Sequence, residues 1–209
     1  MGFGSSVALP LFLCCLFVLS PGCIADLSAP PVTPAIVPAT VTSTPEGPGE
    51  TLPVAGMALQ PDDLPDGYHL KDRTVASYSG ISQVFRDLGW QQGYRVSFYR
   101  QGADWSDATA IVQEIDLYPP DTIKTAYSLN KENLLPAEDS MTDYQVPFPQ
   151  IGDRSIAWRE VRSFDTLSLV TYTVIFTKKN VYETISMTGT STDYEVLRDL
   201  AGKAEAKIR

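Results

Sequence analysis

Proline sets the organisation of this chain, because seven prolines fall between Asp26 and Ala58, with Thr and Ser among them. Proline fixes φ and lacks an amide hydrogen, so neither a helix nor a β-ladder propagates through such a stretch. We therefore predict that residues 26–58 are a disordered stalk of extended, polyproline-like chain. The residues after the stalk must then build the fold, and we expect one globular domain over residues 59–209.

An apolar run of 13 residues, Val7 to Leu19, precedes the stalk. Its length matches the apolar region of a signal peptide and falls short of the ~20 residues that a transmembrane helix needs. We predict that residues 1–25 are an export leader. The domain is then expected at the outer face of the cytoplasmic membrane or the cell surface.

Cys23 is the candidate lipidation site, because the small Gly22 precedes it and the apolar run stands before both. A bacterial-type lipobox, however, has an aliphatic residue where Ser20 stands. Two alternatives stay open: cleavage after Ala25, which would release a soluble protein, and retention of residues 7–24 as a short anchor. Two of the three outcomes keep the domain on a membrane.

The charge of the chain argues against a nucleic-acid partner. The formal net charge is −9, and all 16 Lys and Arg residues lie at Lys71 or beyond without forming a basic cluster. A nucleic-acid binder needs a basic stripe that displaces counterions from phosphates. The acidic balance favours other partners.

Cysteine and histidine usage argues against a metal site. The cysteines are Cys14, Cys15 and Cys23, all in the leader, so the domain has no disulfide and no thiolate ligand. His69 is the only histidine, and no metalloprotease or triad motif surrounds it. We expect neither a metal nor another cofactor.

Alternation of apolar and polar residues predicts a sheet, since side chains of a strand point to its two faces in turn. Residues 80–92 are expected to be a loop with a helical turn. The predicted strands are Tyr68–Asp72 and Thr74–Tyr78 as a hairpin, a strand from Gly93, Thr109–Tyr118, Arg154–Ser163, Leu169–Lys178 and Val181–Thr188.

Two apolar stripes predict helices. Asp121 can cap a helix that reaches Leu134, and Thr192-x-x-Glu195 is a capping-box pattern that opens a C-terminal helix ending near Ile208. We therefore predict an α+β fold: a mainly antiparallel sheet of about six to seven strands, with two helices on its apolar face, in the order β-β-β-β-α-β-β-β-α.

Three short motifs resemble uncharacterised cell-surface lipoproteins of methanogenic archaea. They are LQPDDLPDGY from Leu59, Asp87-Leu88-Gly89-Trp90 running into Gly93-Tyr94, and Ile151-Gly152-Asp153-Arg154-Ser155. The resemblance spans about residues 59–160. It implies a lipid-anchored extracytoplasmic domain of the general α/β kind seen in the PsbP and Mog1 proteins, and it carries over no functional residue. The sequence around Ser20 departs from the expected lipobox.

Aromatic side chains around the first long hairpin mark a possible binding surface. Tyr99, Tyr118 and Trp105 lie in or beside this hairpin, and Trp105 stands between two aspartates at its turn. Exposed Trp and Tyr on a rigid hairpin are typical of protein and carbohydrate contact surfaces. Trp90, in contrast, is expected to pack its loop against the sheet.

A pair of carboxylates supports an alternative to the binding hypothesis, namely catalysis of hydrolysis. Glu114 and Asp116 share one face of a predicted strand, and a pair of carboxylates in a cleft could serve a hydrolase. No motif marks a cleft, so we assign no catalytic residue. The sequence favours a membrane-tethered, non-catalytic extracytoplasmic module that binds an unidentified envelope protein or glycan, with a structural envelope protein and a carboxylate-dependent hydrolase as alternatives.

Overall fold

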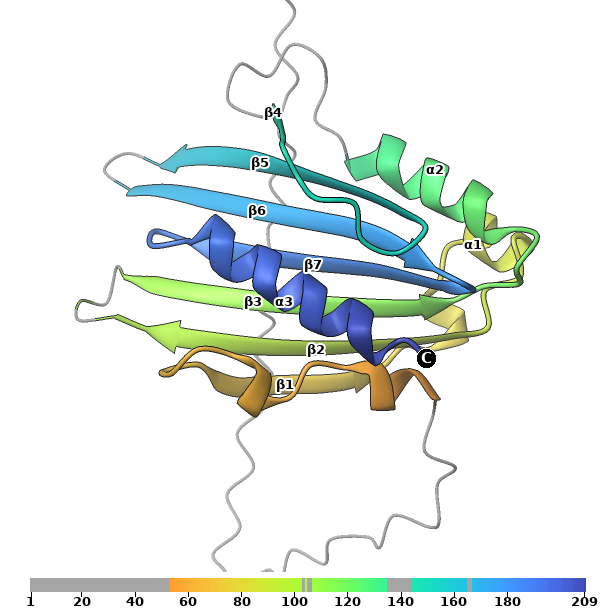
Figure 1. The fold of residues 1–209 in the computed structure, drawn as a ribbon, viewed down its shortest axis with the longest axis horizontal. Coiled ribbons are helices and arrows are strands. Elements are labelled where there is room, and N and C mark those ends of the chain that lie inside the picture. The colour runs from red at the N-terminus through yellow and green to blue at the C-terminus, as the bar shows by residue number, and fades with distance from the viewer. Residues whose placement is uncertain (1–52, 103, 105–106, 135–143, 165–166) are drawn as a thin grey trace, which may run out of the picture. The chain divides into compact units, whose positions relative to one another are not determined.

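The computed structural model describes residues 53–102, 104, 107–134, 144–164 and 167–209, which belong to one compact unit. Within these residues, a seven-stranded antiparallel sheet runs in the order β1-β2-β3-β7-β6-β5-β4 (Figure 1). This confirms the predicted α+β class. The strands are β1 His69–Val75, β2 Gln92–Gln101, β3 Ala108–Leu117, β4 Tyr144–Val146, β5 Arg154–Phe164, β6 Leu167–Lys178 and β7 Val181–Gly189.

Three α-helices and three short 3-10 turns complete the described residues. They are α1 Gln83–Asp87, α2 Ile123–Leu134, α3 Tyr194–Lys207, η1 Pro53–Met57, η2 Pro61–Asp63 and η3 Tyr78–Gly80. The five-residue α1 confirms the helical turn expected within residues 80–92. The strand β4 was not predicted, because its three residues are too few to show an alternating pattern.

The first predicted hairpin is wrong. The two segments expected to pair with each other form one strand, β1, which pairs along its length with β2. The register shifts between Leu70 and Asp72, so the chain accommodates Lys71 as an extra residue without reversing direction. All seven residues of β1 are exposed, because β1 is an edge of the sheet.

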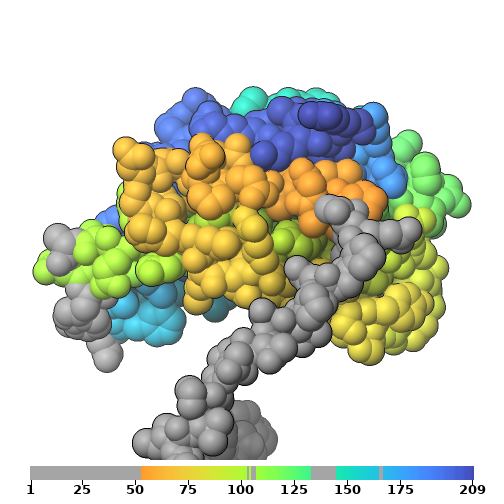
Figure 2. Space-filling model, turned by 90° about the horizontal axis from the view of Figure 1, so that it is seen from below, coloured from red at the N-terminus to blue at the C-terminus, as the bar shows by residue number. Residues whose placement is uncertain are grey.

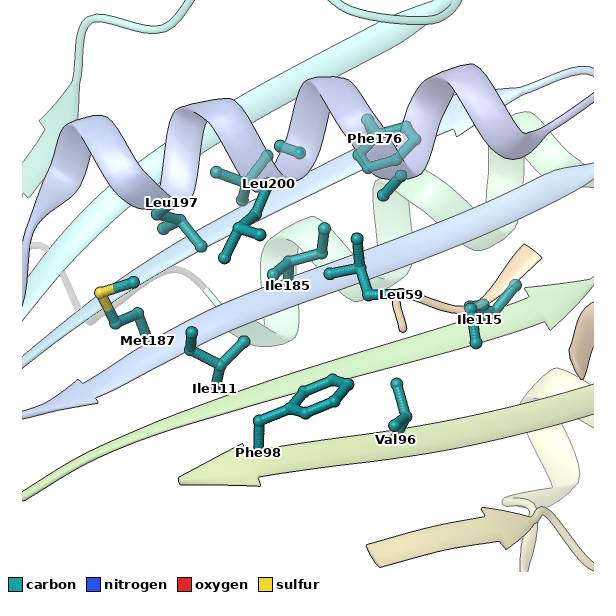
Figure 3. Packing of buried hydrophobic residues seen from close by; sticks show 14 of the residues in the cluster. Leu59, Val96, Phe98, Ile111, Ile115, Phe176, Ile185, Met187, Leu197 and Leu200 are labelled. Atoms are coloured by element: carbon teal, nitrogen blue, oxygen red, sulfur yellow. The ribbon is translucent and has the colours of Figure 1, made fainter. Parts of the chain in front are cut away.

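The two long helices cover opposite faces of the sheet, which corrects the expectation that both lie on one face. The strand β6 shows why: Val174 and Phe176 belong to the core cluster of α3, whereas Ile175 belongs to the cluster that contains Ala126 of α2. Successive residues of a strand point to opposite faces, so apolar residues at both phases demand cover on both sides. The α3 side forms the larger cluster, part of which is shown in Figure 3.

The fold begins before residue 59. Val54 and Leu59 are fully buried in the larger cluster, so residues 53–58, assigned to the stalk from the sequence, pack on the domain. The turn η1 contacts β2, β3 and α3, and the orange segment lies beside the blue helix in Figure 2. Apolar burial therefore outweighs the proline that interrupts regular structure here.

The helix α3 begins one residue away from the predicted cap. Asp193, not Thr192, is the N-cap residue, and its carboxylate accepts hydrogen bonds from the backbone N–H groups of Glu195 at 2.8 Å and Val196 at 3.4 Å. An ionised aspartate also interacts favourably with the positive end of the helix dipole. The predicted stripe is confirmed, since Leu197, Leu200, Ala201, Ala204 and Ile208 are buried.

Candidate functional site

A recess of about 280 Å³ lies on the α2 side of the sheet, where β1, β2 and β3 meet the segment that follows β1. We call it the Asp116 recess. Three carboxylates and one guanidinium line a small volume there, an unusual concentration of charge. Its lining residues are Asp72, Thr74, Ala76, Ile81, Tyr94, Arg95, Glu114 and Asp116.

Asp116 is held by Trp90. The indole Nε1 of Trp90 donates a hydrogen bond to Oδ1 of Asp116 at 2.7 Å. Burial raises the pKa of Asp116 to about 6, against the lowering effect of the Trp90 hydrogen bond, and the negative charge of Glu114 raises the pKa further. The carboxyl of Asp116 therefore changes its charge near neutral pH.

Gly93 leaves the space in which Trp90 and Asp116 meet. It pairs with Asp116 across the β2–β3 ladder. A Cβ at this position would lie 2.5 Å from Oδ1 of Asp116, 2.8 Å from Cζ2 of Trp90 and 2.9 Å from Cβ of Ala76. Only glycine lets the three side chains approach so closely.

The loop before β2 presents Trp90 to the sheet. The N–H of Trp90 donates to the carbonyl of Phe85 at 3.0 Å, and Gly89 adopts a φ of 79°, which turns the chain at the end of α1. Trp90 is buried within the cluster on the α2 side. This confirms that Trp90 packs its loop against the sheet.

Glu114 occupies the exposed part of the recess. Its Oε1 lies 3.6 Å from Nε of Arg95, its direct cross-strand partner, and about half of each side chain is exposed. Solvent screens such a pair, so it contributes little to stability and both groups can exchange it for another partner. The recess therefore combines a partly buried carboxyl, whose pKa is raised to about 6, with a carboxylate and a guanidinium at its rim. These groups can donate to and accept hydrogen bonds from a polar ligand.

Exposed apolar side chains are concentrated along the β1 side of the sheet and in the segment that follows β1. Of the six large hydrophobic residues that are exposed in the described part of the chain, five lie on β1, on β2 or on the segment from η3 to α1. We call these five residues the β1–α1 edge; they are Leu70, Val75, Tyr78, Val84 and Tyr99. The sixth, Phe164, lies at the end of β5.

The residues predicted for a binding surface fall in different environments. Tyr99 is 44% exposed and its ring lies 5.8 Å from that of His69. Tyr118 is only 2% exposed and meets Phe85 edge to face, so it belongs to the core and not to a contact surface, which corrects the prediction. Trp105 and the lipidation candidate Cys23 lie outside the described residues.

A buried acid on the other face escaped the sequence analysis. Glu183 has no exposed area, and burial raises its pKa to about 8 despite a hydrogen bond from Gln113 that lowers it. The signal was present in β7, where residue 183 has the same phase as the apolar Val181, Ile185 and Met187. An acid at an inward position of a strand marks a buried titratable group.

Two further properties concern metals and membranes. In the described ranges, no three or more His, Cys, Asp or Glu side chains gather as metal ligands would. No helix among these residues is long and apolar enough to cross a membrane.

Comparisons with known proteins show a likeness of fold. No family model and no curated protein matches the sequence. The extracellular domain of PknH from Mycobacterium tuberculosis superimposes with a TM-score of 0.51 at 10% identity, over 74% of this chain and 91% of that domain. A putative uncharacterized protein from Mycobacterium smegmatis gives a TM-score of 0.43 at 12% identity, over 74% and 96% of the two chains. The chain shares the architecture of the PknH domain, at an identity too low to carry over any residue's role.

Proposed function

We propose that this chain is an extracytoplasmic binding module, tethered to the outer face of the cytoplasmic membrane through a lipid on Cys23 and a proline-rich stalk, that binds an envelope protein or glycan without transforming it. The β1–α1 edge is the contact surface in this proposal, and the Asp116 recess supplies polar contacts beside it. The same placement would fit the resemblance to the cell-surface lipoproteins of methanogenic archaea.

The concentration of exposed apolar side chains at one edge of the sheet carries the proposal. Val75, Tyr78 and Val84 are each more than half exposed, at 54%, 59% and 53%. Single exposed hydrophobic residues are ordinary, whereas a group of them rimmed by polar residues is typical of a contact surface. Rim charges are supplied here by the recess and by Arg86, whose guanidinium lies 5.7 Å from the ring centroid of Tyr78.

The leader and the fold support an extracytoplasmic location. The apolar run of residues 7–19 has the length of a secretory signal. The fold is shared with a domain described as extracellular, in PknH. Neither observation identifies the partner, so the capture experiment described below has to identify it.

A carboxylate-dependent hydrolase is the second candidate, favoured by one observation. Asp116 has a pKa raised to about 6 and lies in a recess with Glu114, two residues away on the same face. An acid with a raised pKa beside an ionised carboxylate is the arrangement used for general acid catalysis. The recess, at about 280 Å³, is slightly smaller than the ~300–1,000 Å³ of common small-molecule sites, which favours the binding function.

Capture from an envelope extract tests the proposal. The immobilised chain is compared with a Tyr78→Ser/Val84→Ser variant and with Phe164→Ser, which removes the exposed hydrophobic residue at the end of β5. We expect a protein or glycan that the wild type and Phe164→Ser retain and that the double variant loses. Equal retention by all three would place the contact elsewhere. Degradation of a captured glycan that stops in Asp116→Asn would favour the hydrolase.

A further inference from the structure

The N-terminal segment of the domain is joined to the sheet by a chain of buried polar groups. The backbone N–H of Leu59 donates to Oε1 of Gln113 at 2.7 Å, and Nε2 of Gln113 donates to Oε1 of Glu183 at 2.6 Å. Gln113 and Glu183 have no exposed area. One bond thus fixes the segment to β3, and the next fixes β3 to β7.

Apolar contacts reinforce this attachment. Val54 and Leu59 are fully buried, and Leu59 lies among Ile115, Ile185 and Phe176 in the core (Figure 3). The segment therefore contributes side chains to the core, and its removal would expose the polar pair beneath it.

Burial of Glu183 at this position destabilises the folded state. Its Oε2 has no hydrogen-bond partner among the described residues, although the atom is buried. An apolar side chain of similar size would satisfy the core at lower cost, since a buried acid either ionises without compensation or keeps a proton that has no acceptor. A residue of this kind directly under a hydrogen-bonded segment makes the attachment sensitive to its charge.

We propose that Pro53–Leu59 is a releasable clasp between the stalk and the sheet, which stays closed while Glu183 is protonated and opens when Glu183 loses its proton. The two states differ in the solvation of one carboxyl: the closed clasp buries it, and the open clasp admits water to it. Only the protonated form is compatible with the dry environment.

Within the described part of the chain, Glu183 has no ionic partner. Burial is the largest cause of its raised pKa, and the only other cause is the hydrogen bond from Gln113. The cation of β6, Lys178, pairs with Glu205 of α3 at 2.8 Å, and Lys207 of α3 pairs with Asp63 at 2.9 Å. Further along α3, Arg198 pairs with Glu195, and Lys203 pairs with Asp199.

The acids of β3 and the turn η1 place no charged group beside Glu183 either. Glu114 and Asp116 point to the opposite face of the sheet, toward the Asp116 recess. The turn η1 has the sequence PVAGM and carries no titratable side chain. Among the residues that the structure describes, no counter-charge is therefore in place to hold the ionised form in the closed state.

Opening would alter the tether. Residues 53–59 would join the preceding chain and add up to ~25 Å of reach at ~3.5 Å per residue. It would also expose Val54, Leu59 and the Gln113–Glu183 pair on the α3 side of the sheet. The clasp is independent of the proposed partner surface, which lies at the β1–α1 edge.

Hydrogen exchange at the Leu59 amide of the intact chain, read by NMR and corrected for the intrinsic rate, tests the clasp. The pKa of Glu183 is about 8 in the closed clasp and has its ordinary value of 4.5 once water reaches the carboxyl. We therefore expect the equilibrium constant for opening of the clasp to rise by up to about tenfold per pH unit between pH 5 and 8. The core amides of α3, such as that of Leu200, should keep their protection. Equal loss of protection at Leu59 and Leu200 would mean global opening and would overturn the clasp.

Two variants assign the effect to Glu183. Glu183→Gln keeps the shape of the side chain without a titratable proton, so the pH dependence of the Leu59 amide should disappear. Asp116→Asn removes the other carboxyl with a raised pKa, on the opposite face, and should leave that dependence unchanged. Persistence of the wild-type pH dependence in Glu183→Gln would overturn the proposal. If Glu183→Gln does not fold, the wild-type comparison of Leu59 with Leu200 still decides.

Discussion

Trp90 donates its indole N–H to Oδ1 of Asp116 at 2.7 Å and thereby joins the loop after α1 to the third strand of the sheet. The bond connects residues 26 positions apart in the chain. It satisfies one oxygen of a carboxyl whose pKa burial raises to about 6. The stability of the loop and the charge of the recess therefore depend on the same contact.

Trp90→Phe should change both properties. The variant keeps an aromatic ring but removes the donor, so the pKa of Asp116 should rise above its wild-type value of about 6, because the hydrogen bond stabilises the charged form. The free energy of unfolding should fall by about 1–3 kcal/mol. Carbon-detected NMR titration and urea unfolding measure the two effects. Trp158→Phe, in the same core cluster, is the control and should leave the Asp116 pKa in place.

Stability should decline as the pH rises from about 4 to 8. Burial raises the pKa of Asp116 from 3.8 to about 6 and that of Glu183 from 4.5 to about 8. Between these limits the folded state binds more protons than the unfolded state, so the free energy of unfolding falls with increasing pH, at most by about 1.4 kcal/mol per pH unit for each group. Urea midpoints at pH 5 and pH 8 give the sign. A higher midpoint at pH 8 would contradict the burial of these acids.

A separate contribution, from Asp63, should be lost at strongly acidic pH. The pKa of Asp63 is lowered. Burial raises this pKa, but the hydrogen bond from the backbone N–H of Gln60 and the positive charges of Lys207 and Lys203 together outweigh the effect of burial. Its contribution is present above the ordinary value of 3.8 and is lost as the pH falls through the folded pKa. The stability maximum is therefore expected near pH 4–5. In the Asp116→Asn/Glu183→Gln double variant, the free energy of unfolding should fall less steeply as the pH rises toward 8.

Gly93→Ala should destabilise the domain. The new Cβ would lie 2.5 Å from Oδ1 of Asp116 and 2.8 Å from Trp90, a separation that forces the two side chains apart. Overpacking of this kind typically costs about 1–3 kcal/mol. Gly202→Ala is the matched control: it lies within α3 with open space around it, so it should stabilise by about 0.5–1 kcal/mol. Thermal unfolding of the two variants should show shifts of opposite sign.

Local pattern predicted the hairpin of β6 and β7 well. The predicted strands Leu169–Lys178 and Val181–Thr188 agree with the observed ones within two residues, and Lys179-Asn180 forms the loop. The loop residue with positive φ is Lys179, at 57°, although the neighbouring Asn180 is the residue type that tolerates this conformation better. Side-chain propensity alone did not fix which loop position takes the unfavourable conformation.

The candidate site was only partly predictable. Alternation placed Glu114 and Asp116 on one face, which is confirmed by their common recess. The partner of Asp116 and the burial of Tyr118 depend on how the loop before β2 folds back, and that loop has no periodic signal. Glu183 had a readable inward phase, but its partner Gln113 lies 70 residues away and becomes a neighbour only through the β3–β7 pairing.

Cys23→Ser should release the chain from the membrane or arrest its processing. The small Gly22 and the apolar run of residues 7–19 stand before Cys23, as lipidation requires, and the proline-rich stalk after it offers no membrane-binding face. Each buried acyl methylene adds about 0.8 kcal/mol of membrane affinity, so loss of the thiol removes the anchor. Fractionation with intact-mass measurement checks this. Cys14→Ser and Cys15→Ser, within the apolar run, are the controls and should stay membrane-bound with the lipidated mass. A Cys23→Ser chain that remains in the membrane, differing from the wild type only by the substituted atom, would instead identify residues 7–24 as an uncleaved anchor.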